Sequence, residues 1–98
     1  MDWAVRVASF YELALVDNRI GPVHISLYFA LLVESGSCGL DLILPVRERL
    51  MSMAKISSTV TYHRCLRELS AYGYIDYRPS FASGRSRVEI IELGRFVK

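Results

Sequence analysis

The stretch from Ile56 to Leu69, ISSTVTYHRCLREL, followed by Gly73-Tyr74-Ile75, decides the fold. Its apolar residues recur at positions i, i+3, i+4 and i+7, the spacing of one helical face: Tyr62, Cys65, Leu66 and Leu69. Ser57 or Ser58 is expected to cap this helix, and Gly73 is expected to end it. The segment therefore predicts an amphipathic helix over residues 58–72.

The phase of this helix decides which side chains face outward. The favoured phase exposes five residues: Thr59, Val60, His63, Arg64 and Arg67. A competing phase turns Val60 and His63 inward and Tyr62 outward. We favour the first phase because it buries two leucines and a small cysteine and exposes both arginines.

The flanking segments predict a shorter helix before this one and two strands after it. Pro45 is accepted in a first helical turn, so a helix is expected from there through Met53, with an inward stripe of Val46, Leu50 and Met53. Lys55-Ile56-Ser57 then forms the turn. Residues 74–78 alternate as a strand does, residues 79–85 form a tip, and residues 86–93 return with one apolar face of Val88, Ile90 and Leu93.

The first 44 residues supply two more helices and a short strand. An N-terminal helix over residues 2–16, with Asp2 as its cap, has one face at helical spacing: Trp3, Val7, Phe10 and Ala14. Residues 24–33 are apolar nearly all round and predict the buried spine of the core. Gly36 is expected to end that helix as a left-handed cap, and residues 40–44 suit a short strand.

Helix, turn, helix and basic hairpin, in this order, is the layout of a winged helix-turn-helix. The expected fold class is α+β, mainly α, with a three-helix core, a β-hairpin wing and an additional N-terminal helix. We expect a single domain over residues 1–98, with an N-terminal helix and loop at 1–22, the winged-helix core at 23–93 and a tail at 94–98.

Composition excludes several classes of protein. A hydrophobic content of 52% in 98 residues is enough for one core. No apolar run approaches the ~18 residues of a membrane span, and no basic-then-apolar leader opens the chain, so a cytoplasmic protein is expected. Cys38 and Cys65 are isolated, which is typical of reduced thiols. The histidines and cysteines lack zinc-like or triad-like spacing, so we expect no enzyme, no cofactor and no metal.

The net charge of +2 hides an asymmetry between the two halves of the chain. Up to Leu44, two cations face five acidic residues, a net charge of −3; from Pro45 onward, ten cations face five acidic residues, a net charge of +5. The positive charge thus lies on the segment predicted to form the helix-turn-helix and the wing. A solvated surface would explain this charge equally well, so it supports a polyanionic partner only together with the fold.

The predicted fold indicates which residues would contact DNA, because an α-helix fits the major groove. On the second helix we expect contacts from Ser58, Thr59, Val60, His63, Arg64 and Arg67. Phosphate positioning is favoured over base reading for the two arginines, and Ser58 is also a helix cap. For His63, a DNA contact and an ordinary surface position are equally favoured. On the wing we expect contacts from Arg78, Arg85 and Arg87, near the minor groove or its phosphates.

Two parts of the sequence together resemble a family of short winged-helix proteins carried by bacterial mobile elements, such as conjugative transposons and plasmids. The resemblance spans roughly residues 24–88 and rests on residues 24–28, 50–51, 55–56, 61–69 and 73–75, on Tyr77, Pro79-Ser80 and Ser86. It departs at the wing, where residues 81–85 read Phe-Ala-Ser-Gly-Arg. The resemblance implies DNA contacts from Thr61, Tyr62, His63 and Arg64.

The expected function is sequence-specific binding of double-stranded DNA, in a transcriptional regulator of a mobile element. The alternatives are an excision or replication accessory factor and a winged helix used only for protein–protein interaction. An aromatic face on the N-terminal helix, made of Trp3, Phe10 and Tyr11, suits either a homodimer interface or packing on its own domain.

Overall fold

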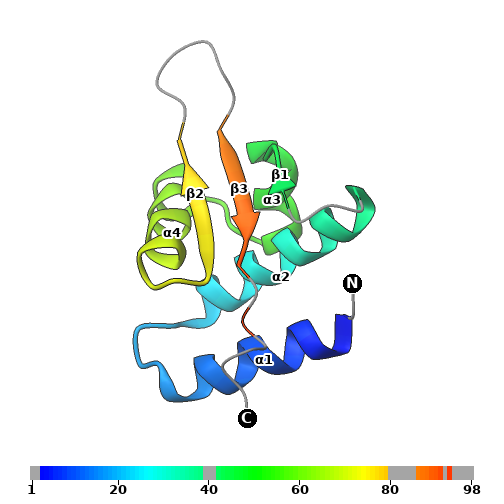
Figure 1. The fold of residues 1–98 in the computed structure, drawn as a ribbon. Helices are drawn as coiled ribbons and strands as arrows, with labels where there is room; N and C mark the ends of the chain where they lie inside the picture. The colour runs from blue at the N-terminus through cyan, green and yellow to red at the C-terminus, as the bar shows by residue number, and fades with distance from the viewer. Residues whose placement is uncertain (1–2, 39–41, 80–85, 92, 94–98) are drawn as a thin grey trace.

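The computed structural model describes residues 3–38, 42–79, 86–91 and 93. Their elements are α1 (Trp3–Val16), α2 (Pro22–Cys38), β1 (Leu42–Ile43), α3 (Arg47–Ala54), α4 (Thr59–Ala71), β2 (Ile75–Arg78) and β3 (Arg87–Ile90). Over these residues the chain is an α+β fold that is mainly helical (Figure 1). None of the described helices is long and apolar enough to cross a membrane.

Helix α2 is the centre of the core, as the sequence predicts. Its residues Leu27, Tyr28 and Leu31 are fully buried, and it contacts α3, α4 and the sheet. The predicted end at Gly36 is wrong, because the helix continues to Cys38. Two side chains make bonds near its end: Arg49 on α3 donates to the Glu34 carboxylate at 2.8 Å, and the buried Ser35 hydroxyl donates to the Leu32 carbonyl of the same helix.

Helix α1 packs on the rest of its own domain through Phe10. The Phe10 ring is fully buried and stacks on Tyr28 at 4.0 Å between ring centroids, with Tyr74 edge-on at 5.4 Å. Phe10 is therefore a core residue, which removes it from the predicted dimer face. Tyr11 remains 40% exposed, and the Trp3 side chain lies outside the described part of the structure.

The three strands form one antiparallel sheet in the order β1-β3-β2. Val88 and Ile90 on β3 are buried together with Leu93, which confirms the predicted apolar face of the return strand. The register places Arg78 at the end of β2 opposite Arg87 at the start of β3. This end of the hairpin points away from α1 (Figure 1).

Helix α3 begins later than the sequence predicts. Pro45 precedes it, and Val46 is its N-cap residue with 47% exposure, so Val46 does not belong to the inward stripe. The buried residues of α3 are Leu50 and Ala54. Met53, the third residue of the predicted stripe, is partly buried against the core.

Candidate nucleic-acid interface

The turn between α3 and α4 is fixed by local backbone geometry. Lys55 adopts a left-handed conformation at φ 61°, and the Ile56 N–H donates to the Met51 carbonyl at 2.9 Å. Ser58 then caps α4, because its hydroxyl oxygen accepts from the Thr61 N–H at 3.2 Å. The predicted Ser cap is thus confirmed, and it orients the first turn of α4.

The two faces of α4 are those of the favoured phase. Its buried residues are Tyr62, Cys65, Leu66 and Leu69. Val60 is 75% exposed, which excludes the competing phase. Tyr62 is only 2% exposed, and burial raises the pKa of its hydroxyl to about 12. The resemblance had placed Tyr62 among the DNA contacts; we correct this, because its side chain belongs to the core.

The exposed face of α4 carries two arginines with little competition for their guanidinium groups. Arg64 lies 3.9 Å from the Glu68 carboxylate, at the outer limit of an ion pair, and its side chain is 53% exposed. Arg67 is exposed and makes no ion pair with any residue that the structure describes. Exposed pairs of this kind contribute about 0–1 kcal/mol, so both arginines are free to exchange partners.

His63 has one ring nitrogen committed to its own helix. Its Nδ1 lies 3.1 Å from the Thr59 carbonyl oxygen, which can only accept, so Nδ1 carries the proton in that contact. Nε2 is then an acceptor in the neutral ring and a donor only in the imidazolium. His63 is half-buried beside Tyr62, with ring centroids 5.1 Å apart.

The hairpin contributes a second set of cations. Arg78 and Arg87 occupy directly opposite positions, an arrangement of like charges that costs stability unless an anion lies nearby. Asp76 lies 3.2 Å from Arg78, whereas Arg87 is exposed and has no ion-pair partner among the described residues. Arg85, the predicted tip residue, lies outside the described residues.

A small hollow of about 60 Å³ joins α3, α4 and the hairpin, with Arg47, His63, Tyr77 and Ser86 among its lining residues. Arg47 is half-exposed, and among the residues that the structure describes it pairs with the exposed Glu48, 3.0 Å away. The sequence indicates that Arg47 faces solvent or phosphate, but Arg47 is not among the predicted DNA contacts.

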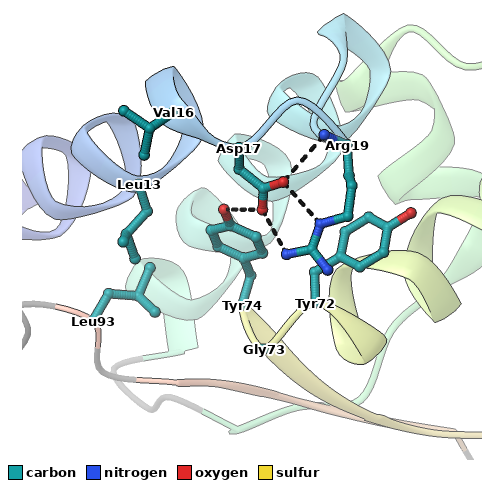
Figure 2. A pocket seen from close by; sticks show the side chains of 8 residues that line it. All are labelled: Leu13, Val16, Asp17, Arg19, Tyr72, Gly73, Tyr74 and Leu93. Carbon is teal, nitrogen blue, oxygen red and sulfur yellow. Dashed lines mark hydrogen bonds and ion pairs between the residues drawn. The ribbon is translucent and has the colours of Figure 1, made fainter.

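A larger hollow of about 490 Å³ lies at the opposite end of α4, where Tyr72, Gly73 and Tyr74 meet the α1–α2 loop (Figure 2). Asp17 accepts there from the Arg19 side chain at 2.8 Å and from the Tyr74 hydroxyl at 2.8 Å. The bonds from Arg19 hold the pKa of the Asp17 carboxyl well below its usual range. Arg19 also lies over the Tyr72 ring, 4.1 Å from its centroid.

The charged side chains in the larger hollow bond to one another. Asp17 receives bonds from Arg19, in the same loop, and from Tyr74. The Tyr74 bond and the contact of Arg19 with the Tyr72 ring connect the α1–α2 loop to the segment at the end of α4. Gly73, with φ 93°, completes the left-handed end of α4 there, as predicted. This region therefore positions α4 relative to α1.

The positions of the exposed arginines are the basis for assigning a function to this chain. The exposed face of α4 and the end of the β2–β3 hairpin at Arg78 and Arg87 both carry arginines. No protein-family model, no curated protein and no solved structure matches this chain.

Proposed function

We propose that the chain is a winged helix-turn-helix domain that binds double-stranded DNA sequence-specifically. In this proposal α4 enters the major groove, and the β2–β3 hairpin acts as the wing along the sugar-phosphate backbone. One observation carries it: the outward face of α4, with Arg64 and Arg67, belongs to the same half of the chain as the paired Arg78 and Arg87 of the hairpin.

The dimensions of α4 support the proposal. Its 13 residues make a rod about 20 Å long, and a helix of about 10–12 Å diameter fits a major groove about 12 Å wide. Thr59 and Val60 lie in its first turn, where recognition helices contact base edges. Val60 is an isolated apolar side chain at 75% exposure, and its methyl groups suit contact with a thymine methyl.

Each predicted contact has a chemical role. Arg64 is long enough and free enough to fork onto guanine N7 and O6, whereas Arg67, Arg78 and Arg87 are expected to hold phosphates. Ser58 and Thr61 remain candidates for phosphate contacts through their hydroxyl groups. Arg47 joins this set because it borders the hollow between α4 and the hairpin.

The resemblance to mobile-element proteins supports a transcriptional regulator, acting in the cytoplasm, as the biological role. An excision or replication accessory factor would use the same contacts but would bend the DNA strongly. Measuring the bend angle of the bound site separates these two roles. The homodimer stays a prediction. Of the face predicted for it, Tyr11 is 40% exposed, whereas Phe10 is buried in the core of its own domain.

The test compares two arginines of similar exposure. Arg64 lies on the outward face of α4, whereas Arg49 lies on α3 against Glu34 and is 56% exposed. After a preferred duplex has been selected from a random pool, Arg64→Ala is expected to weaken its binding by about 1–3 kcal/mol and to relax the preference at one base pair. Arg49→Ala removes the same charge and is expected to preserve that preference.

Equal loss in both variants would mean that only net charge matters and would overturn the assignment of α4. Absence of binding by the wild-type protein to any duplex would favour the interaction-module alternative.

A further inference from the structure

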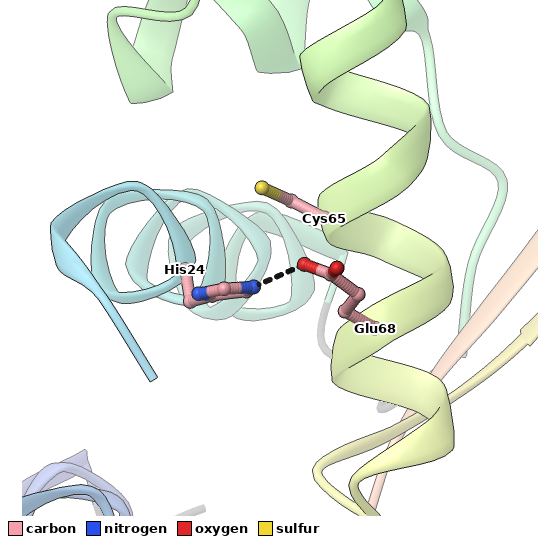
Figure 3. Close-up of side chains that lie close together, drawn as sticks. All are labelled: His24, Cys65 and Glu68. Carbon is pink, nitrogen blue, oxygen red and sulfur yellow. Dashed lines mark hydrogen bonds and ion pairs between the residues drawn. The ribbon is translucent and has the colours of Figure 1, made fainter. Parts of the chain in front are cut away.

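Three side chains with metal-binding atoms meet where α2 crosses α4. His24 lies in the first turn of α2, and Cys65 and Glu68 stand three residues apart on α4 (Figure 3). One ligand atom from each residue lies within 4.8 Å of the other two. The spacing along the sequence does not predict this cluster, because Cys65 lies 41 positions after His24.

The hydrogen bonds within the cluster define its present state. His24 Nδ1 accepts from the Gly21 N–H at 3.0 Å, so the proton of the neutral ring lies on Nε2. Nε2 donates to Glu68 Oε1 at 2.7 Å. The Cys65 thiol is fully buried, and burial raises its pKa, so it is a protonated thiol and a poor nucleophile.

The cluster is close to the geometry of a metal site. Zinc binds sulfur at about 2.3 Å and imidazole nitrogen at about 2.0 Å, so two such ligands at a tetrahedral angle lie about 3.5 Å apart. His24 Nε2 and Glu68 Oε1, which lie 2.7 Å apart, would separate by about 0.5 Å to bind one ion, and all three ligand atoms already lie within 4.8 Å of one another. One imidazole, one thiolate and one carboxylate form a donor set that suits zinc better than magnesium or calcium.

We propose that His24, Cys65 and Glu68 form a binding site for a zinc-type divalent cation, with a fourth coordination position open to water. His24 Nε2, Cys65 Sγ and one Glu68 carboxylate oxygen are the protein ligands. The site goes beyond DNA binding and does not depend on it, since all three ligands belong to the free protein. It connects the first turn of α2 to the middle of α4.

Metal binding redistributes two protons. The Cys65 thiol releases its proton to solvent and becomes the thiolate ligand. The His24 ring gives up the proton on Nε2 and takes one on Nδ1, so it stays neutral while Nε2 binds the ion. Nδ1 then no longer accepts from the Gly21 N–H, which lies before the first turn of α2 and can bond to water instead.

Neighbouring charges also respond to the ion. Glu68 also pairs weakly with Arg64 at 3.9 Å, and coordination would withdraw the carboxylate from that pair. If α4 binds DNA as proposed, the ion would thus release Arg64 toward the DNA. This consequence rests on the proposed function, whereas the metal site itself does not.

The test is a titration with Co²⁺, a spectroscopic substitute for zinc, into reduced protein that carries no polyhistidine tag. The expected result is saturation at one equivalent, with visible bands of four-coordinate cobalt and a near-ultraviolet band from thiolate-to-cobalt charge transfer. Zn²⁺ is expected to abolish these bands by displacement. Cys65→Ser is expected to lose the charge-transfer band, and Glu68→Gln and His24→Gln are expected to weaken binding at least tenfold.

Two variants serve as matched controls. His63→Gln removes the other histidine and Cys38→Ser removes the other cysteine, and both are expected to give the wild-type spectrum. Circular dichroism of each variant separates loss of the site from loss of the fold, and Glu68→Gln is the least disruptive because Glu68 is about one-third exposed. Absence of cobalt bands in the folded wild-type protein would overturn the proposal, and so would a charge-transfer band that persists in Cys65→Ser.

Discussion

Replacing Phe10 by alanine tests whether α1 is an integral part of the domain. The Phe10 ring is fully buried, stacks on Tyr28 with an interplanar angle of 7° and meets Phe29 and Tyr74 edge-on. The Phe10→Ala variant removes all of these contacts and leaves a ring-sized cavity between α1 and α2. If the account is correct, the whole domain loses stability.

The expected loss in the free energy of unfolding follows from this burial. Phenylalanine-to-alanine changes at buried sites cost about 3–5 kcal/mol. The three ring contacts place Phe10 in the upper half of that range, because each aromatic pair adds about 0.5–1.5 kcal/mol. A domain of 98 residues has a total stability of about 5–15 kcal/mol, so the variant is expected to be close to unfolding at 37 °C.

Urea denaturation followed by two probes provides the assay. Circular dichroism reports on all helices, whereas fluorescence of Trp3, the single tryptophan, reports on α1. Tyr11→Ala is the matched control, because Tyr11 is the next residue, is 40% exposed and is expected to cost about 1 kcal/mol. Equal losses for the two variants, or a Trp3 transition that precedes the circular dichroism transition in the wild type, would refute the reasoning.

Three further predictions concern local features. Gly73→Ala is expected to cost about 1–2 kcal/mol in urea unfolding purely from backbone strain, because φ is 93° and an added Cβ meets no atom within 4 Å; an unchanged midpoint would contradict the left-handed helix end. Ser58→Ala is expected to cost about 1 kcal/mol by loss of the α4 cap, and Ser57→Ala, the neighbouring control, much less. The pKa of Asp17 is lowered in the folded state, so its stabilisation is complete above its usual value of 3.8 and is lost as pH falls through the lower, folded value. Asp17→Asn is therefore expected to destabilise the protein at neutral pH and to flatten the acid side of its stability profile, and identical acid profiles for both proteins would refute the linkage.

The local elements of this chain are readable from its sequence. The i, i+3, i+4 pattern from Tyr62 to Leu69 gives the buried face of α4, and the structure bears it out. Ser58 and Gly73 mark the ends of α4 through local hydrogen bonding and backbone conformation alone. Such features depend on neighbours within a few residues, so they can be predicted from a single sequence.

Features that depend on distant partners were missed. Gly36 has the composition of a helix end, but α2 continues past it to Cys38. The bond from His24 to Glu68 joins residues 44 apart, and the bond from Tyr74 to Asp17 joins residues 57 apart. A single sequence contains no signal for such pairs, because each member has an ordinary local environment. The candidate metal site and the anchoring of α4 to α1 both depend on contacts of this kind.

The most direct test of DNA binding is a fluorescence-anisotropy titration of random-sequence duplex DNA at about 50 mM and about 200 mM salt. Three phosphate contacts, one from each of Arg67, Arg78 and Arg87, predict a slope of about −2.7 in log K against log salt. The affinity is then expected to fall roughly 40-fold between the two conditions. Binding that does not respond to salt, or no binding at the lower concentration, would contradict the claim that these arginines form a DNA-binding surface.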